Sequence, residues 1–182
     1  NEVIAEVLQR RPDCPIHIHV AEQMQEVEDC VQVHGRRPVE FLFENFDVKS
    51  NWCLIHATHL NQQEIELMAR CRVVAGLCPT TEANLGDGLF SAREYLAADG
   101  RISIGSDSHC SVDIRDELRL LEYGQRLFTH QRAVLGTADQ SVGRYLFEQS
   151  SAGGASAIGM KTGRIMPGYR ADMILVDPQH PA

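Results

Sequence analysis

The sequence predicts an α/β fold built on a parallel β-sheet. Short apolar runs alternate with stretches of helical periodicity along most of the 182 residues, which is the pattern of βα units. The runs recur at intervals of roughly 30 residues, the spacing of a (β/α)8 barrel. Each run also ends in a histidine, an aspartate or a polar loop, and barrels of this kind place their chemistry at the carboxyl ends of the strands. Four such units make half a barrel.

Four strands are expected, each bounded by polar or turn-forming residues. They are IHIHVA at 16–21, WCLIHA at 52–57, RVVAGLC at 72–78 and RISIGSD at 101–107. Helical periodicity predicts an amphipathic helix in the opening segment NEVIAEVLQRR and further helices at 22–34, 37–45, 61–70, 91–98 and 115–128. The segment SVGRYLFEQSSAGGASAIG at 141–159 predicts one more helix, with a face of small residues.

A change of pattern near residue 163 predicts a domain boundary. In GRIMPGYRADMILVD, a Pro-Gly turn precedes an apolar run that ends in aspartate. We expect residues 1–163 to form the half-barrel, and residues 164–182 to begin a separate segment with a strand outside it. The chain opens without methionine, inside a helical pattern, and stops just after this strand, so we expect an internal fragment of a longer protein.

Composition argues against several classes of partner. The formal net charge is −8 and no run of Lys or Arg is long, so no nucleic-acid partner is expected. No apolar run approaches the roughly 20 residues of a membrane helix, so no membrane partner is expected either. The six cysteines form no CxxC pair and are expected to be free thiols in the cytoplasm.

Side chains with metal-binding or catalytic chemistry stand at the ends of the predicted strands. HIHVAEQ at 17–23 contains two histidines and a glutamate, WCLIHATHL contains His56, and RISIGSDSH contains Asp107. A barrel would bring His19, His56 and Asp107 to one mouth. Histidine nitrogens and carboxylate oxygens suit zinc or another first-row divalent metal, whose bound water becomes a nucleophile near neutral pH. An adjacent carboxylate or imidazole can transfer protons to a leaving group.

The other histidines in these motifs are assigned lesser roles. We expect His59 and His109 to pack beside the site or support it. His17 lies on the same strand face as His19, because residues two apart share a face, and either structural support or substrate contact is open to it. His34 ends a predicted helix, where a positive charge is favourable.

Five segments together resemble the second half of the amidohydrolase superfamily, from barrel strand five to the return into its small β-sandwich domain. They are HIHVAEQ, LIHATHL, GLCPTTEANLGDG, GSDSH and GRIMPGYRADMILVD. Within the superfamily, the chain is most similar to the formimidoylglutamate deiminases, which hydrolyse N-formimino-L-glutamate to N-formyl-L-glutamate and ammonia in histidine degradation. The most specific parts are HVAEQ, WCLIHATHL with CPTTEANLGDG, and ELRLLEYGQRL. The resemblance spans nearly the whole chain.

The resemblance implies one zinc ion per site, with other first-row divalent metals as substitutes. It implies His19 and Asp107 as metal ligands, with Asp107 also accepting a proton from the bound water. Glu22 would be the proton shuttle to the departing nitrogen, and His56 would face the bound water and the substrate. Four residues after the third strand would line the substrate pocket: Thr80, Thr81, Glu82 and Asn84.

One feature of the superfamily is missing from this chain. The first-strand His-x-His pair, which supplies two more metal ligands, has no counterpart upstream of residue 16. We therefore expect the parent protein to be the deiminase, a homodimer acting on a small molecule, and these 182 residues alone to be inactive. Two alternatives stay open: an aromatic aminohydrolase of the guanine or S-adenosylhomocysteine kind, and an inert half-barrel that serves only in assembly. The loop CPTTEANLGDG favours the deiminase over the aromatic aminohydrolases.

Overall fold

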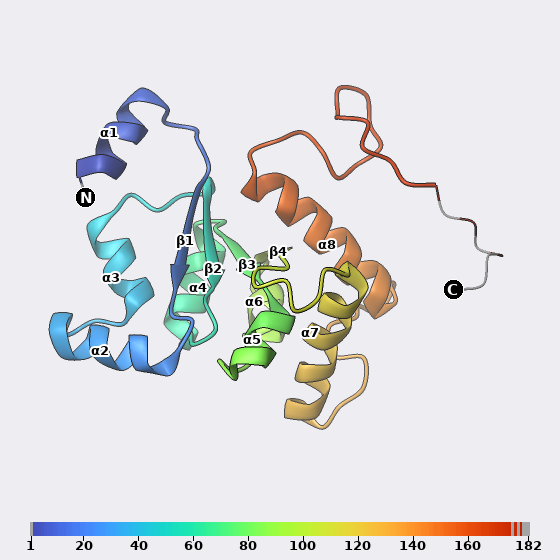
Figure 1. Ribbon diagram of the computed structural model, residues 1–182, viewed down its shortest axis with the longest axis horizontal. Coiled ribbons are helices and arrows are strands. Elements are labelled where there is room, and N and C mark those ends of the chain that lie inside the picture. The colour runs from blue at the N-terminus through green and yellow to red at the C-terminus, as the bar shows by residue number, and fades with distance from the viewer. Residues whose placement is uncertain (1, 176, 178, 180–182) are drawn as a thin grey trace.

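The computed structural model describes residues 2–175, 177 and 179 (Figure 1). Its strands are β1 (Ile16–Val20), β2 (Trp52–His56), β3 (Val74–Leu77) and β4 (Arg101–Ile104). Its helices are α1 (Glu2–Arg10), α2 (Met24–His34), α3 (Pro38–Asn45), α4 (Gln62–Arg70), α5 (Pro79–Leu85), α6 (Ala92–Ala97), α7 (Ile114–Thr129) and α8 (Val142–Ala157). None of the helices in this described part has the length and apolar character needed to cross a membrane.

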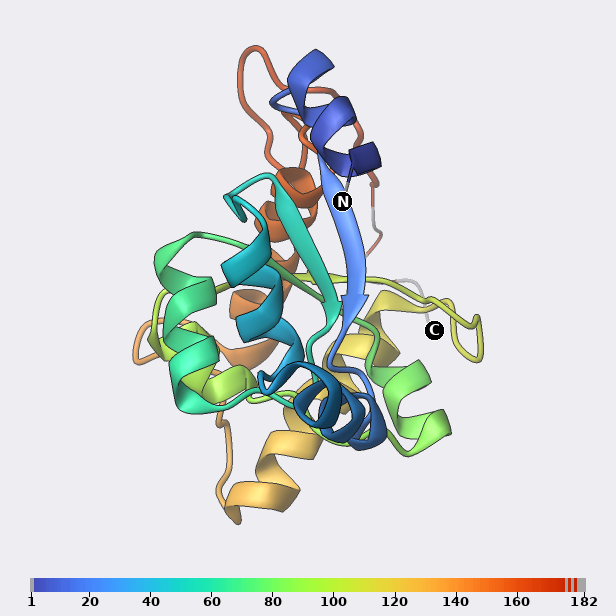
Figure 2. The same cartoon turned by 90° about the vertical axis from the view of Figure 1, so that its left-hand side faces the viewer.

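The four strands form one parallel sheet in the order β1-β2-β3-β4. The register pairs Val20 with His56 and Leu77 with Ile104, so neighbouring strands end close to one another. Figures 1 and 2 show the strands running in one direction. Helices α2 and α5 start near the edge of the sheet at which the strands end. The predicted parallel α/β sheet is confirmed, and this carboxyl edge is where side chains from distant segments meet.

Helices α2, α3, α4 and α6 bury one face of the sheet. The fully buried large side chains include Trp52 and Leu54 of β2, Met68 of α4 and Tyr95 of α6. The Tyr95 hydroxyl donates to Val73 O (2.7 Å), so this buried phenol has a hydrogen-bond partner. Strands β2 and β3 are almost wholly buried, as expected for parallel strands covered on both faces.

Strand β1 is buried on one face only. Its exposure alternates along IHIHV, which leaves His17 and His19 on the same, more open side, as the sequence predicts. The His17 ring lies 2.8 Å through Nε2 from Ala157 O at the end of α8. Because a carbonyl only accepts hydrogen bonds, His17 donates from Nε2. This contact with α8 is a structural one, and a contact of His17 with substrate stays a prediction.

An ion pair fixes the loop that follows β2. The Glu64 side chain is buried and accepts hydrogen bonds from Asn61 N (2.9 Å) and Arg37 Nε (2.8 Å). Arg37 also donates from Nη2 to His59 O (2.6 Å). A single guanidinium therefore ties the start of α3 to the start of α4 and to the segment that follows His56.

Two sequence predictions differ from the structure. The segment after β3, expected to be a polar loop, forms α5, which begins at Pro79 and ends before Gly86 in the left-handed conformation (φ +74°). The strand expected within 163–177 is not formed over the described residues 163–175. Ile165, Ile174 and Leu175 are almost fully exposed there, because no strand in the described part of the chain pairs with this segment. The domain boundary near residue 163 stays a prediction.

Helix α8 lies directly against β4, and two adjacent glycines give a matched test of this contact. A Cβ on Gly153 would lie 1.8 Å from Ile102 O, whereas a Cβ on Gly154 would meet nothing within 4 Å. We expect Gly153→Ala to destabilise the fold by about 1–3 kcal/mol or more through overpacking. Gly154→Ala should stabilise it by about 0.5–1 kcal/mol, since alanine favours helix over glycine.

Urea unfolding followed by the fluorescence of the single, buried Trp52 measures both effects. Equal unfolding midpoints for the two variants would contradict the close approach of α8 to β4.

Candidate functional site

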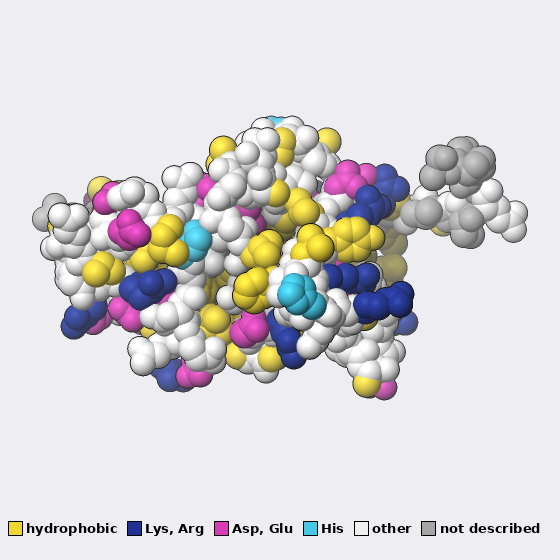
Figure 3. All heavy atoms as spheres, turned by 90° about the horizontal axis from the view of Figure 1, so that it is seen from below, with side chains coloured by type: hydrophobic (Ala, Val, Ile, Leu, Met, Phe, Trp, Pro, Cys, Tyr) yellow, Lys and Arg dark blue, Asp and Glu magenta, His cyan; other side chains and the backbone are white. Residues whose placement is uncertain are grey.

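Several side chains with catalytic or metal-binding chemistry gather at the carboxyl edge of the sheet. His19 is the penultimate residue of β1, His56 is the last residue of β2, and Cys78 directly follows β3. Glu22 and Asp107 lie two and three residues beyond the ends of their strands. Figure 3 views the molecule from this side and shows histidine and acidic side chains among hydrophobic ones.

His56 is at the centre of the cluster and is only 1% exposed. Its Nδ1 lies 3.2 Å from Glu82 Oε1, and its Nε2 lies 3.6 Å from Glu22 Oε1 and 3.9 Å from Asp107 Oδ2. The rings of His56 and His19 are 5.3 Å apart between centroids. The structure therefore brings together the predicted residues His19, Glu22, His56 and Asp107, although up to 88 positions separate them in the sequence.

Glu82 fixes the orientation of the His56 ring. The Glu82 carboxylate is buried and also accepts a hydrogen bond from Cys78 N (2.8 Å) through the same Oε1. A carboxylate accepts, so the proton of the shared bond lies on His56 Nδ1. The other nitrogen, Nε2, is left facing Glu22 and Asp107.

The remaining predicted pocket residues of α5 have mainly structural contacts. Thr80 donates to Glu117 from both its backbone N (2.9 Å) and its Oγ1 (2.6 Å). Thr81 Oγ1 lies 2.9 Å from Ser108 Oγ, and Asn84 is exposed. The prediction that these residues line a substrate pocket stays a prediction. Their hydrogen bonds hold α5 against α7 and against the segment that follows β4.

The backbone is strained at the residues that turn out of the sheet. His56 (φ +64°) and Asp107 (φ +42°) adopt left-handed conformations that L residues rarely take, and so do Ala21 (φ +50°) and Ala57 (φ +47°). The hydrogen bond from Ala57 N to Val20 O (3.1 Å) supports this turn. Conformations of this kind cost about 1–3 kcal/mol each and cluster at functional sites.

The environment shifts the pKa of three groups in the cluster. Burial acts to lower the pKa of His56, but the hydrogen bond with Glu82 and the charges of Glu22, Glu82 and Asp107 outweigh it and raise that pKa. Burial raises the pKa of Glu22, and the neighbouring Asp87 raises it further. Burial raises the pKa of the Cys78 thiol to about 12, so this thiol is protonated at neutral pH.

Asp87 is a site residue that the sequence reasoning missed. It follows α5, is 7% exposed and accepts a hydrogen bond through Oδ1 from Gln23 Nε2 (3.1 Å). Its backbone N donates to Glu82 O (2.9 Å). The Gly-Asp-Gly triplet at 86–88 is the signal that could have found it, because two glycines around one acid permit a tight turn that buries the side chain.

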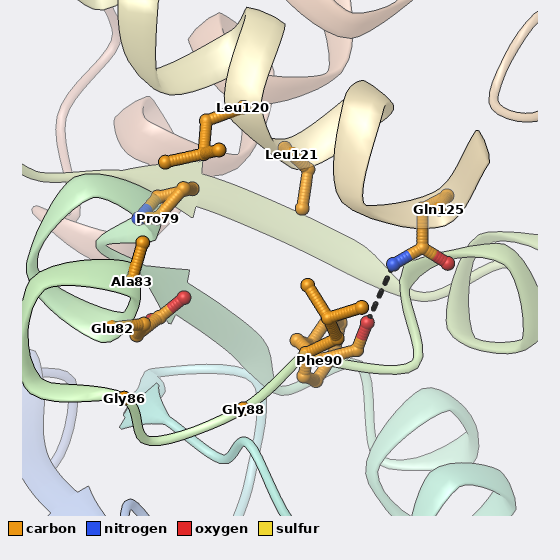
Figure 4. Close-up of a pocket in the computed structure, with 10 residues that line it drawn as sticks. Pro79, Glu82, Ala83, Gly86, Gly88, Phe90, Leu120, Leu121 and Gln125 are labelled. Atoms are coloured by element: carbon orange, nitrogen blue, oxygen red, sulfur yellow. Dashed lines mark hydrogen bonds between the residues drawn. The ribbon is translucent and has the colours of Figure 1, made fainter. Parts of the chain in front are cut away.

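An apolar cavity of about 230 Å³ lies between α5, the segment 86–90 and α7 (Figure 4). Leu89, Phe90, Leu120 and Leu121 contribute to its lining. Gln125 donates from Nε2 to Phe90 O (2.9 Å), which ties the segment 86–90 to α7. The lining is mostly apolar, so this cavity offers few groups that could react with a substrate. The ionisable side chains of this part of the molecule lie in the His56 cluster instead.

Three side chains are close enough to share a metal ion. Ligand atoms of His56, Cys78 and Asp107 all lie within 4.8 Å of one another. A nitrogen, a sulfur and a carboxylate oxygen form a donor set that suits zinc. Asp107 is one of the two ligands that the sequence predicts, and the other, His19, is next to the group through its contact with the His56 ring. Cys78 was not predicted, although a thiol directly after a strand is a detectable signal.

Comparisons with known proteins agree on one family. The family model described as "Amidohydrolase family" matches residues 1–182. The chain is 51% identical to formimidoylglutamate deiminase of Pseudomonas aeruginosa over 170 residues, 93% of this chain and 38% of the relative. The crystal structure of an amidohydrolase from Brucella melitensis superposes with a TM-score of 0.83 at 53% identity, over 86% of this chain and 35% of that one.

A zinc-bound structure is also similar. An adenosine deaminase from Xanthomonas campestris, crystallised with bound zinc, superposes with a TM-score of 0.77 at 26% identity, over 87% of this chain and 35% of that one. The chain thus spans about two fifths of the length of the curated relatives it matches.

Replacement of Glu82 tests its hold on His56. Glu82→Gln keeps an oxygen acceptor but removes the negative charge, so the pKa of His56 should fall from its raised value. The titration of the His56 ring protons by NMR measures this change. Glu66→Gln, at an exposed position on α4, removes the same charge without touching the cluster. A His56 titration that is the same in both variants would contradict the assigned contact.

Proposed function

Because this chain belongs to the amidohydrolase family, we propose that its parent protein hydrolyses N-formimino-L-glutamate to N-formyl-L-glutamate and ammonia. The observation that best supports this function is the meeting of Glu22 and Asp107 at the same nitrogen of His56. One carboxylate can take a proton from water while the other gives one to the leaving nitrogen. The 51% identity to the Pseudomonas aeruginosa deiminase supports the choice of substrate.

The proposal concerns the whole protein, of which this chain would supply one half of the catalytic barrel. The four parallel strands would be strands five to eight of a (β/α)8 barrel, and residues 164–182 would begin a small β-sandwich domain. In the described sheet, β1 and β4 each have one unpaired edge, and the rest of a barrel would pair with both. The isolated chain is expected to be inactive, because the first-strand His-x-His pair has no counterpart in it. A homodimer in the cytoplasm is part of the same proposal.

Zinc fits the residues present, since the imidazole of His19 lies beside the His56 ring and the carboxylate of Asp107 approaches the same ring from the end of β4. We assign His19 and Asp107 as ligands from this chain, with other first-row divalent metals as substitutes. When bound, the metal would supply a hydroxide near neutral pH and polarise the reacting group.

The residues of the chain would divide the proton transfers among themselves. Asp107 accepts a proton from the attacking water. His56 Nε2 faces the oxygen that attacks the formimino carbon, with Glu82 holding the ring in place. The C–O bond forms as the C=N double bond opens, Glu22 delivers a proton to the departing nitrogen, and the C–N bond breaks to release ammonia. The added hydroxyl returns its proton to Glu22 as the formyl carbonyl forms. Burial raises the pKa of Glu22, which favours the protonated form that this delivery requires.

Ammonia release tests the proposed function directly. The whole protein, supplied with zinc, should release ammonia from N-formimino-L-glutamate and none from guanine or S-adenosylhomocysteine. Release from an aromatic amine alone would replace the deiminase with an aromatic aminohydrolase. If the metal-bound protein released no ammonia from any of the three substrates, the result would support an inert half-barrel that serves only in assembly.

Glu22→Gln tests the proton delivery. Glutamine keeps the size of the side chain but cannot donate the acidic proton, so kcat for N-formimino-L-glutamate should fall by about 10²–10⁴-fold. Glu28→Gln, at an exposed position on α2, serves as the control and should leave kcat unchanged. A Glu22→Gln enzyme with the kcat of the unmodified protein would remove Glu22 from the mechanism.

A further inference from the structure

A large polar hollow lies at the amino end of the sheet, whereas the His56 cluster lies beyond the carboxyl ends of the same strands. The hollow has a volume of about 990 Å³ and is bounded by the turn before β3, the start of β4, α8 and the segment that follows α8. Its charged lining residues are four arginines and two acids: Arg72, Arg101, Arg144, Arg164, Asp99 and Glu148. This lining is cationic, although the whole chain has a formal net charge of −8.

Only one of the four arginines is paired with a carboxylate. Arg144 donates from Nε to Glu148 Oε1 (2.9 Å), so these two charges compensate each other. Over the part of the chain that the structure describes, Arg72, Arg101 and Arg164 form no ion pair. Three guanidinium charges around one hollow therefore have no counter-charge from the protein.

The backbone holds two of these arginines against α8. Arg101 begins β4, and its Nη1 donates to Ser156 Oγ (3.2 Å), a neutral group on the helix. Arg164 follows Gly163 (φ +74°), where a Cβ would lie only 2.8 Å from Ser151 O. Glycine therefore lets this segment lie directly on the helix. Both arginines are thus carried by backbone that packs on α8, which forms one wall of the hollow.

The third arginine reaches the hollow from another segment. Arg72 lies in the tight turn between α4 and β3 (φ +57°), where its backbone N donates to Ala69 O (2.9 Å). A guanidinium group is always charged at neutral pH, and its planar fork of N–H donors matches phosphate and carboxylate oxygens. A tetrahedral phosphate presents oxygens in several directions, so it suits donors that come from three separate segments better than a planar carboxylate does.

We propose that this hollow binds a phosphate group through Arg72, Arg101 and Arg164, either as inorganic phosphate or as part of a small phosphorylated molecule. Charge-assisted hydrogen bonds to phosphate would supply the counter-charge that the three arginines lack. The volume lies within the range of about 300–1,000 Å³ that is usual for small-molecule sites, so a ligand larger than phosphate itself fits. The site is separate from the His56 cluster and does not depend on the substrate proposed for it.

Calorimetry on the whole protein tests this site. At neutral pH and constant ionic strength, we expect inorganic phosphate to bind at least about tenfold more tightly than succinate, whose two carboxylates are planar. Arg72→Gln and Arg164→Gln, at exposed positions, should each weaken phosphate binding at least about tenfold. Arg93→Gln removes the same charge at an exposed position on α6, outside the hollow, and should leave the affinity unchanged.

Two further titrations identify the ligand and exclude the other anion-binding position. Glycerol 3-phosphate that binds more tightly than phosphate would identify a phosphorylated molecule as the ligand, and the reverse order would identify inorganic phosphate. A metal ion at the His56 cluster also attracts phosphate, so the titration is repeated after the metal is removed with a chelator. Binding in the hollow should persist, because none of its arginines belongs to that cluster.

Three outcomes would overturn the inference. The first is an unmodified protein that binds no phosphate, which would mean that the rest of the parent protein fills the hollow. The second is equal affinity for phosphate and succinate, which would reduce the site to a general attraction for anions. Neither result needs a variant. The third is full phosphate affinity in folded Arg72→Gln and Arg164→Gln proteins.

Discussion

The hydrogen bond between Glu82 and His56 is the interaction on which the arrangement of the site depends. Glu82 belongs to α5 and His56 ends β2, so this bond joins two segments that follow neighbouring strands. Both side chains are buried, where a hydrogen bond is electrostatically stronger than in water and a broken one leaves two unsatisfied groups. The bond from Cys78 N to the same carboxylate oxygen fixes Glu82 in turn. The direction of His56 Nε2 is therefore set by the end of β3, not by β2 alone.

The parallel sheet makes this arrangement possible. Its strands end in register, so short segments after each strand can meet without long loops. The chain must then leave the sheet abruptly, and it does so through left-handed residues at His56 and Asp107. These conformations are costly, but the buried β2–β3 centre of the sheet and the Arg37–Glu64 pair hold the following segments in place. Packing next to the site thus compensates for the strain of the backbone within it.

Local patterns in the sequence predict the strands, seven of the eight described helices and the cluster residues His19, His56 and Asp107. The roles expected of Glu22 and Glu82 come from the family resemblance. Alternation in IHIHV places His17 and His19 on one face, and the strand ends identify His56 and Asp107. Helix α5 escapes prediction because PTTEANL is short and polar, and its hydrogen bonds from Thr80 go to Glu117, 37 positions away. Asp87 escapes for a similar reason, since it pairs with Gln23, 64 positions away. Sequence periodicity gives no information about contacts between residues so far apart in the chain.

The strand expected within 163–177 is the opposite case, because here the local pattern is present but no strand forms over the described residues 163–175. Its apolar pattern is a sound local signal, but a strand forms only when another strand satisfies its backbone groups, and none does so over the described residues 163–175. A pattern that depends on a partner strand cannot be judged from the pattern alone. The unpaired edges of β1 and β4 likewise need partner strands to satisfy their backbone groups.

The charge of the site links its structure to its chemistry. The carboxylates of Glu22, Glu82 and Asp107 lie close to His56, and their partial burial makes the repulsion among them stronger than it would be in water. Burial raises the pKa of Glu22, and the charge of the neighbouring Asp87 raises it further. A divalent cation would lower the local negative charge, so it would bind more favourably than to a neutral site and would stabilise the folded state by linkage. The same acidic groups that repel one another thus supply affinity for the metal ion that the proposed reaction needs.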